Sequence, residues 1–404
     1  MMQIKIIRGT HQIGGSITEI LTAQARIIID MGSELPRSDG FESKFLDIDG
    51  VTCGKPQCDA VFITHYHGDH VGMYETVLPE IPVYMGAIAK QIFSVVQRTL
   101  KNKLDIGNPE RISTFHTFDV GTPIFIKDIK ITPYLIDHSA FDAYMFLIEA
   151  EGKRVLHTGD FRMHGVRGHK MPTVFEKYAH DIDVLIIEGT MLSRTSEKVM
   201  TEHELGCKAK KILHDNKNVF VLCSSTNIDT IAEFYNAAIE NHRLFVVCDD
   251  FQTEIFQIVS ATSKSSFYNF DRHKVYVYGK NLNSLMSQYG FCFLGRANTV
   301  TKRAMATFSD NTLIYSMWRG YLDKTHVAFD QYKSEFVNSA VVNGSHIEYL
   351  HTSGHADLSS IMKVCEITQA KIIVPIHSEK PAAIESLALT GEVKILQDGE
   401  SIMI

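Results

Sequence analysis

The N-terminal half of the chain alternates short apolar runs with glycine-containing turns. Runs rich in β-branched residues occupy 4–7, 16–21 and 25–30, and Gly14-Gly15 and Met31-Gly32 interrupt them. Runs of this length and composition predict strands joined by tight turns. Further strands are expected at 60–64, 130–135, 144–149, 154–156 and 184–188, with a helix at 87–101 and a polar loop at 36–54.

The pattern changes after residue 193. Helical spacing of apolar positions occupies 202–215, 229–241 and 252–260, and strand-like runs separate these segments at 219–223 and 244–248. This alternation indicates βαβ units and a mostly parallel sheet. Short strands return at 347–350, 371–376 and 393–396, beside a helix at 358–367. We therefore expect one domain in two parts, 1–194 and 341–404, with an α/β lobe inserted at 195–340.

Composition narrows the class of protein. With 45% hydrophobic and 22% charged residues, the chain has the balance of an ordinary globular protein. Its apolar runs are far shorter than the ~20 residues that a membrane helix needs, so we expect no membrane association. The N-terminus has the pattern of a strand rather than a signal peptide. The seven cysteines are widely scattered, and Cys53 and Cys58 lack a second pair that would favour zinc. We expect a cytoplasmic protein without disulfides.

Charge is unevenly distributed along the chain. The net charge of −7 argues against a uniformly basic nucleic-acid binder. Between positions 261 and 320, however, there are eight Lys or Arg residues, two acids and eleven aromatic residues. This stretch is either a basic solvated face over an aromatic core or a surface for a polyanion.

The strongest chemical signal is the motif Thr64-His65-Tyr66-His67-Gly68-Asp69-His70, directly after a predicted buried strand. Its three imidazoles and one carboxylate fall within six residues. On a tight turn, His65 and His67 can point at one metal ion while Asp69 and His70 point at a second. Imidazole and carboxylate together suit zinc and tolerate manganese or iron. The motif therefore indicates a metal site better than it indicates a coincidental polar loop.

Two other predicted strands end in residues of the same kind. Asp137-His138 follows the strand at 130–135, and His138 is a candidate third nitrogen ligand. His157-Thr158-Gly159-Asp160 follows the strand at 154–156, and the Asp160 carboxylate can bridge two cations. Either residue alone is more often structural. Their occurrence at strand ends, together with the His65–His70 motif, favours one shared metal centre.

These residues resemble the pattern of the metallo-β-lactamase superfamily. The resemblance rests on Gly14-Gly15, Ile29-Asp30-Met31-Gly32, the His65–His70 motif, His138 and Thr158-Gly159-Asp160. It implies an αββα sandwich with two divalent metal ions at its mouth. It also implies that one ion is held by His65, His67 and His138. The second ion would be held by Asp69 and His70, with Asp160 between the two ions.

Later motifs resemble the β-CASP nucleic-acid-processing branch, in which an α/β β-CASP cap domain is inserted into the sandwich. Glu188 matches the acidic motif of that branch, His355 its second-motif histidine, and His377 its last histidine, a ligand to the second metal. The His351-Thr352-Ser353-Gly354-His355 form is most similar to the ribonuclease J group. The chain ends soon after these motifs, so we expect that the separate C-terminal domain of that group is absent.

The resemblance and the chemistry together suggest roles for individual residues. His355 is the candidate general acid, kept basic by Glu188, and Asp69 belongs to the same catalytic set. Candidate phosphate contacts are Ser353, His351, Ser225, Thr226 and Asn227, the last three in a loop similar to a phosphate-contacting loop of the ribonuclease J group. Arg319 either grips a phosphate at the end of a strand or pairs with Asp323. The resemblance is not complete: where the ribonuclease J group has a small Gly/Ser-rich loop, this chain has Tyr315-Ser316-Met317-Trp318-Arg319-Gly320.

We therefore predict a metal-dependent phosphodiester hydrolase that acts on single-stranded RNA, as an exonuclease, an endonuclease or both. Two divalent ions, zinc or alternatively manganese, would activate the attacking water. The alternatives are a DNA nuclease of the same fold and a hydrolase of a small phosphodiester or other ester. A non-catalytic nucleic-acid-binding subunit is disfavoured because all seven candidate ligands are present. A homodimer is left open.

Overall fold

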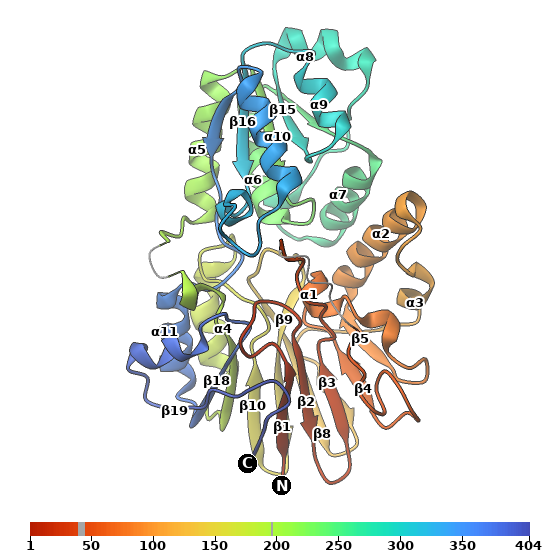
Figure 1. Ribbon diagram of the computed structural model, residues 1–404, viewed down its shortest axis with the longest axis vertical. Coiled ribbons are helices and arrows are strands. Elements are labelled where there is room, and N and C mark those ends of the chain that lie inside the picture. Colours follow the sequence, from red (N-terminus) through yellow and green to blue (C-terminus); the bar gives the residue numbers. More distant parts are fainter. Residues whose placement is uncertain (39–44, 195–196) are drawn as a thin grey trace.

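The computed structural model describes residues 1–38, 45–194 and 197–404 of the chain. It has two lobes, with the inserted lobe at one end of a β-sandwich and both chain termini at the other end (Figure 1). The predicted loop at 36–54 lies partly outside the described residues. Its described residues form neither a helix nor a strand.

The sandwich lobe contains two seven-stranded mixed sheets. The order of the first is β20 (Ser401–Met403), β1 (Gln3–Arg8), β2 (Ile17–Leu21), β3 (Arg26–Ile29), β4 (Ala60–Phe62), β5 (Val83–Gly86) and β6 (His116–Phe118). The order of the second is β19 (Glu392–Val393), β18 (Ile372–Ile376), β11 (Val184–Glu188), β10 (Lys153–His157), β9 (Ala143–Ala150), β8 (Ile129–Ile136) and β7 (Ile124–Ile126).

Apolar side chains from both sheets fill the space between them. Phe62 and Phe146 are fully buried there and meet edge to face, with ring centroids 5.8 Å apart. Helices α2 (Ala87–Leu104) and α3 (Pro109–Ser113) cover the outer face of the first sheet. Helices α4 (Met171–Tyr178) and α11 (Leu358–Thr368) cover the outer face of the second. The expected αββα sandwich is confirmed.

The inserted lobe is a six-stranded sheet in which every neighbouring pair is parallel. Its order is β14 (Val275–Val277), β13 (Leu244–Val247), β15 (Phe291–Gly295), β12 (Asn218–Cys223), β16 (Asn311–Ser316) and β17 (His346–Tyr349). Alternate residues of β12 are buried on opposite faces, Val219 and Val221 on one face and Phe220 and Leu222 on the other. A buried parallel sheet with helices on both faces follows from such continuous apolar runs.

Six helices cover the two faces of this sheet. One face is packed by α5 (Glu202–Asp215), α6 (Ile228–Glu240) and α7 (Asp250–Thr262), and the other by α8 (Asn283–Tyr289), α9 (Thr299–Met305) and α10 (Gln331–Val342). Helix α5 begins where the sequence predicts because Thr201 and Glu204 form a reciprocal capping box. The predicted βαβ alternation and mostly parallel sheet are therefore confirmed.

Two expectations about strands near the end of the sequence differ from the structure. We expected the strand near residue 347 to rejoin the sandwich, but β17 pairs with β16 and extends the inserted sheet. Strand pairing of this kind depends on tertiary contacts that a single apolar run does not encode. The domain limits 1–194, 195–340 and 341–404 themselves remain a prediction. The strand expected at 393–396 is also different, because β19, in the second sheet of the sandwich, covers only Glu392–Val393.

The aromatic residues between 261 and 320 mostly belong to the core. Tyr268, Phe291, Phe293 and Tyr315 are all buried, so this stretch is largely a packed interior rather than a stacking surface. No helix in the described ranges combines the length and apolar character that a bilayer crossing requires. All seven cysteines are free thiols, as expected.

Candidate metal centre and active site

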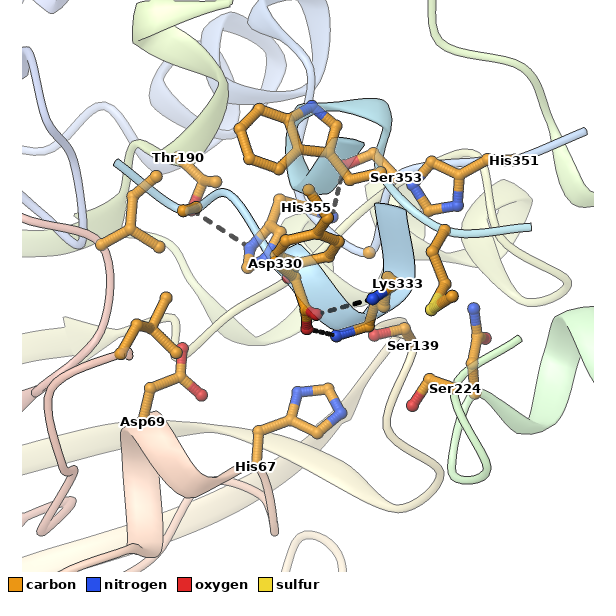
Figure 2. Close-up of a pocket in the computed structure, with 18 of the residues that line it drawn as sticks. His67, Asp69, Ser139, Thr190, Ser224, Asp330, Lys333, His351, Ser353 and His355 are labelled. Carbon is orange, nitrogen blue, oxygen red and sulfur yellow. Dashed lines mark hydrogen bonds and ion pairs between the residues drawn. The ribbon is translucent and has the colours of Figure 1, made fainter. Parts of the chain in front are cut away.

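A cavity of about 880 Å³ lies between the two lobes. Its wall includes His67, Asp69 and His355 from the sandwich lobe and Ser224 and Lys333 from the inserted lobe (Figure 2). The parallel strands β10, β11 and β18 end on the same edge of their sheet. The residues that follow these strands, together with the loop after β4, therefore meet at this cavity.

The first cluster of ligand-type atoms belongs to His65, His67 and His138, whose nearest ring nitrogens lie within 4.8 Å of one another. His138 donates its Nδ1–H to the carbonyl oxygen of Gly354 over 2.6 Å, so Nε2 is the ring nitrogen that carries the lone pair. That Nε2 lies 3.2 Å from Nδ1 of His67. His65 Nδ1 lies 3.0 Å from the Thr64 hydroxyl, which itself donates to Asp30, so Nε2 of His65 is also free.

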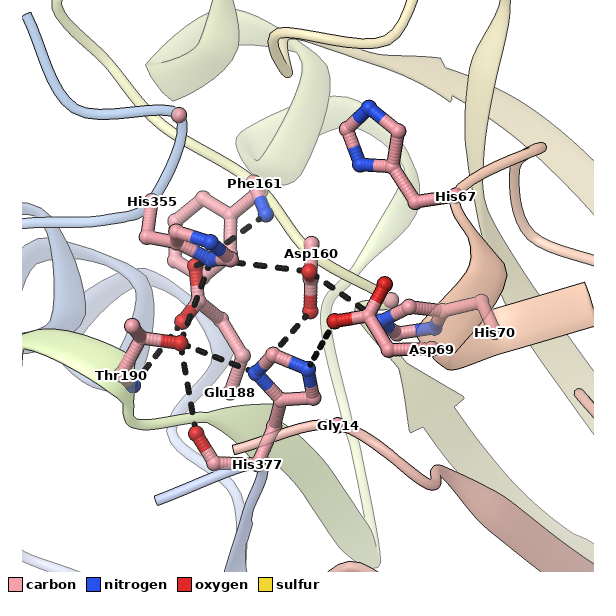
Figure 3. A network of polar contacts seen from close by, with 12 residues as sticks. Gly14, His67, Asp69, His70, Asp160, Phe161, Glu188, Thr190, His355 and His377 are labelled. Atoms are coloured by element: carbon pink, nitrogen blue, oxygen red, sulfur yellow. Dashed lines mark hydrogen bonds and ion pairs between the residues drawn. The ribbon is translucent and has the colours of Figure 1, made fainter. Parts of the chain in front are cut away.

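The second cluster contains Asp69, His70, Asp160 and His377 (Figure 3). Asp30 Oδ2 lies 2.7 Å from Nδ1 of His70, so Nε2 of His70 faces Asp160 Oδ2 at 3.1 Å. His377 lies between the two carboxylates, with Nε2 3.2 Å from Asp69 Oδ2 and Nδ1 3.7 Å from Asp160 Oδ1. Asp160 Oδ2 is also 4.0 Å from His65 Nε2, so this carboxylate reaches both clusters.

The donor set fits divalent cations. The Nε2 atoms of His65 and His70 and both carboxylate oxygens of Asp160 are buried and make no hydrogen bond. When Nδ1–H of His70 donates to Asp30, the 3.1 Å approach of its Nε2 to Asp160 Oδ2 brings two acceptors together. Buried polar atoms are almost always satisfied, so four orphans at one point indicate a missing partner. Imidazole nitrogens held by second hydrogen bonds, together with a carboxylate between them, are typical of zinc and manganese sites.

Electrostatics of the first cluster favour neutral imidazoles. Burial lowers the pKa of His67 to about 4. Burial also lowers the pKa values of His65 and His138 well below the ordinary value for histidine. All three are therefore deprotonated at neutral pH, which is the form that binds a metal ion.

A third set of contacts joins His355 to Glu188. The Glu188 carboxylate is fully buried and accepts backbone N–H bonds from Ala356 at 2.9 Å and Thr190 at 3.0 Å. His355 Nδ1 lies 3.4 Å from Glu188 Oε1 and 3.5 Å from Asp160 Oδ2 (Figure 3). Burial acts against protonation, but these two carboxylates raise the pKa of His355 above its usual value. Because Nδ1 faces the carboxylates, Nε2 is the ring atom left for the cavity.

Four of the five predicted phosphate contacts from the two loops line the cavity, namely Ser353, His351, Ser225 and Asn227. The Ser353 hydroxyl accepts the backbone N–H of His355 over 3.0 Å. The Ser225 hydroxyl accepts from Arg296 over 3.3 Å. Thr226 is not among the lining residues, and its backbone carbonyl accepts a hydrogen bond from Tyr66 Oη of the sandwich lobe.

Arg319 does not lie where the sequence predicted. It is exposed, is not among the residues that line the cavity, and holds its guanidinium 4.2 Å from the ring centroid of Tyr349. The alternative partner, Asp323, instead accepts hydrogen bonds from the backbone and hydroxyl of Thr325. The structure therefore shows neither an ion pair between Arg319 and Asp323 nor a place for Arg319 in the cavity wall, and a contact of Arg319 with substrate stays a prediction. The side chain turns away because the ring of Tyr349, on the neighbouring strand, offers it a flat surface.

One buried cation that the sequence did not reveal connects the lobes. Arg162 has no exposed surface, and its guanidinium bonds Glu202 at 2.9 Å and Asp229 at 2.8 Å, both in the inserted lobe. It also lies 3.4 Å from Asp137 and donates to the carbonyl of Ser353 over 3.0 Å. The Arg162 ion cluster thus ties the inserted lobe to the loop that carries His355.

Comparison with known families agrees with this geometry. Residues 49–215 match the family described as "Beta-lactamase superfamily domain". Residues 340–389 match the family described as "Zn-dependent metallo-hydrolase RNA specificity domain". The first match contains His65 to Glu188, and the second contains His351, His355 and His377.

Individual relatives are similar over almost the whole chain. It is 20% identical to a ribonuclease J of Helicobacter pylori, an alignment that covers 99% of this chain and 60% of the relative. It is 22% identical to a ribonuclease J of Mycoplasma genitalium, with 97% and 72% coverage. The chain thus spans about 60% of the length of the first of these relatives. A crystal structure of a protein of unknown function from Enterococcus faecalis V583 has the same fold, with a TM-score of 0.78, 18% identity and complete coverage of both chains.

Proposed function

Because the chain belongs to the metallo-β-lactamase superfamily, with an inserted cap lobe and an RNA specificity domain, we propose that it is a metal-dependent ribonuclease. The reaction would be hydrolysis of a phosphodiester bond in single-stranded RNA. The match at 340–389 and the ribonuclease J relatives support RNA as the substrate class.

The residues for two divalent ions are those of the two clusters. His65, His67 and His138 would hold one ion, Asp69, His70 and His377 the other, and Asp160 would contact both. When bound, the ions would supply an activated water and neutralise charge on the phosphoryl oxygens. Neighbouring residues hold the ligand histidines in position. Gly354, Thr64 and Asp30 contact the Nδ1 atoms of His138, His65 and His70, respectively, so the Nε2 atoms are the ones available to an ion.

His355 would donate the proton to the departing oxygen. Its Nδ1 faces Glu188 and Asp160, and the ring lies in the cavity wall, so Nε2 is the atom that can reach a substrate. Glu188 would hold the ring in this orientation, because backbone N–H groups fix the carboxylate. A general acid of this kind contributes about 10²–10⁴-fold to a rate.

Substrate phosphates would be met on the side of the cavity formed by the inserted lobe. Ser225, Asn227 and Arg296 line this side, with Ser353 and His351 beside them. Hydroxyl, amide and guanidinium donors of this kind are common partners of a nucleic-acid backbone.

The observation that carries the proposal is the group of buried, unpartnered ligand atoms of His65, His70 and Asp160. Other members of the same two clusters, His67 and Asp69, line the cavity between the lobes. The test is cleavage of end-labelled RNA and DNA oligonucleotides, each with 5′-phosphate or 5′-hydroxyl, by protein loaded with Zn²⁺ or Mn²⁺. Cleavage of RNA in preference to DNA is expected, and the product lengths separate exonuclease from endonuclease action. Preference for DNA, or hydrolysis of small phosphodiesters alone, would contradict the proposal.

A further inference from the structure

Trp318 lies in the cavity wall two residues after β16, the strand next to the edge strand β17 of the inserted sheet. Its indole N–H donates to Glu197 Oε1 over 3.2 Å. The rings of His326 and Tyr321 meet it edge to face, with centroids 4.8 and 5.5 Å away. A Cβ on Gly320 would overlap the indole, so glycine allows the backbone to pass close to it. The indole is therefore fixed on several sides.

Arg194 is stacked on this fixed ring. Its guanidinium carbon lies 3.7 Å from the ring centroid of Trp318, closer than in the other cation–π contacts of the described residues. Arg194 also lines the cavity. It follows η3 (Thr190–Ser193), whose first residue contacts His355 and His377 through its hydroxyl. Arg194 therefore stands four residues along the chain from a hydroxyl that contacts two residues of the candidate active site.

The charge of Arg194 is not neutralised as the charges of its neighbours are. Arg296 and Lys333, also in the cavity wall, form ion pairs with Asp249 and Asp330. No described carboxylate forms such a pair with Arg194, and its Nε is buried without a hydrogen-bond partner. Burial lowers the pKa of Arg194 and outweighs the opposite effect of the nearby carboxylates Glu197, Glu379 and Glu188. Arginine nevertheless stays charged at any physiological pH.

We propose that Arg194, held over the ring of Trp318, binds the phosphate adjacent to the one that is cleaved. This inference rests on the proposed function and adds a phosphate subsite on the Thr190 side of the cavity, away from the Ser224–Asn227 loop. Stacking leaves the N–H edge of a guanidinium free, and that edge matches a phosphate with two parallel bonds. Because the fixed indole holds the guanidinium group in one orientation, little side-chain entropy is lost when it binds a phosphate.

Two substrates separate this role from a general effect on catalysis. A single-stranded RNA oligonucleotide has a phosphate on either side of the cleaved bond, whereas bis(p-nitrophenyl) phosphate has only the reacting phosphate. Arg194→Gln in the metal-loaded full chain should raise KM for RNA by about 10-fold or more, as expected for a lost charge-assisted hydrogen bond. The rise in KM for bis(p-nitrophenyl) phosphate should be at least 10-fold smaller than the rise in KM for RNA.

Salt dependence gives a second, independent readout. Loss of one phosphate contact should reduce the slope of log KM against log salt by about 0.7 for Arg194→Gln. Arg194→Lys should keep that slope while binding more weakly, because lysine retains the charge and loses the fork. Trp318→Leu should weaken RNA binding in the same direction as Arg194→Gln, because the cation loses its support. Arg98→Gln, on the surface of α2, is the matched control and should leave KM and slope unchanged.

The outcomes distinguish this inference from the proposed function. Wild-type protein that cleaves no RNA would contradict the proposed function. Wild-type cleavage combined with an unaltered KM and salt slope in Arg194→Gln would overturn only the Arg194 subsite. A lower melting temperature with an unchanged salt slope would show that Arg194 and Trp318 merely pack together, and would also overturn it.

Discussion

Replacement of Arg162 by methionine tests how the inserted lobe is joined to the candidate active site. The side chain has no exposed surface and neutralises three carboxylates, Asp137, Glu202 and Asp229, from separate segments of the chain. Methionine fills most of the volume but leaves these carboxylates without their cation. Burial already raises the pKa values of Asp137 and Glu202, so their ionised forms are costly even beside Arg162.

Breaking a buried ion pair while leaving its partners in place lowers the free energy of unfolding by about 3–5 kcal/mol, and we expect a loss of this size for Arg162→Met. Because a typical domain has only about 5–15 kcal/mol of stability, this loss is large. The assay is urea denaturation followed by tryptophan fluorescence, since the single Trp318 lies at the junction of the lobes. Arg162→Met should also lower metal content, because Arg162 holds the Ser353 carbonyl next to Gly354, whose own carbonyl orients His138.

Arg98→Met supplies the matched control for this prediction. Arg98 also pairs with a carboxylate of the inserted lobe, Glu254, but the two side chains are 47% and 44% exposed. Exposed pairs contribute about 0–1 kcal/mol, so this variant should be nearly as stable as wild type. If Arg162→Met lowered the free energy of unfolding no more than Arg98→Met does, the importance assigned to the buried ion cluster would be refuted.

Three further predictions concern single side chains. His355→Ala should retain its metal yet lose about 10²–10⁴-fold in the rate of RNA cleavage. The rate on bis(p-nitrophenyl) phosphate should fall much less, because its leaving group needs no proton. Equal losses of rate on the two substrates would contradict the general-acid role. Asp160→Ala should lower the content of both metal ions by elemental analysis, and two retained ions would exclude a bridging role. Burial raises the pKa of Glu233 to about 8, so the folded state binds the extra proton and its stability should fall as pH rises from about 4.5 to 8. Glu233→Gln should flatten this decline and raise the free energy of unfolding at pH 9 by about 1 kcal/mol in urea titrations; the gain is no larger because partial exposure screens the charge. An unchanged dependence of stability on pH would contradict the assignment of the decline to Glu233.

The sequence predicted the motif-bearing strands because each is a short buried run that ends directly before a polar residue. Strand β11, which ends at Glu188, and helix α5 both have the predicted bounds. The clustering of His65, His138, Asp160 and His377 could be anticipated from parallel strand ends and from the family resemblance.

Features that depend on tertiary contacts could not be predicted in this way. The pairing of β17 with β16 requires knowledge of which sheet edge is available. Arg319 turned toward the ring of Tyr349 because of that same pairing. Arg162 stands two residues after Asp160, but only the fold brings its three carboxylates together. The only signal for Arg194 was the unusual Trp318 beside which it stacks.

The central claim is that the protein is a hydrolase whose activity requires metal at the two histidine–carboxylate clusters. The most direct measurement combines elemental analysis with RNA cleavage on the same sample, before chelation, after chelation, and during stepwise return of Zn²⁺ or Mn²⁺. The account predicts about two ions per chain, loss of cleavage with their removal, and recovery in proportion to the ions restored. Undiminished RNA cleavage by protein that elemental analysis finds free of metal would contradict it.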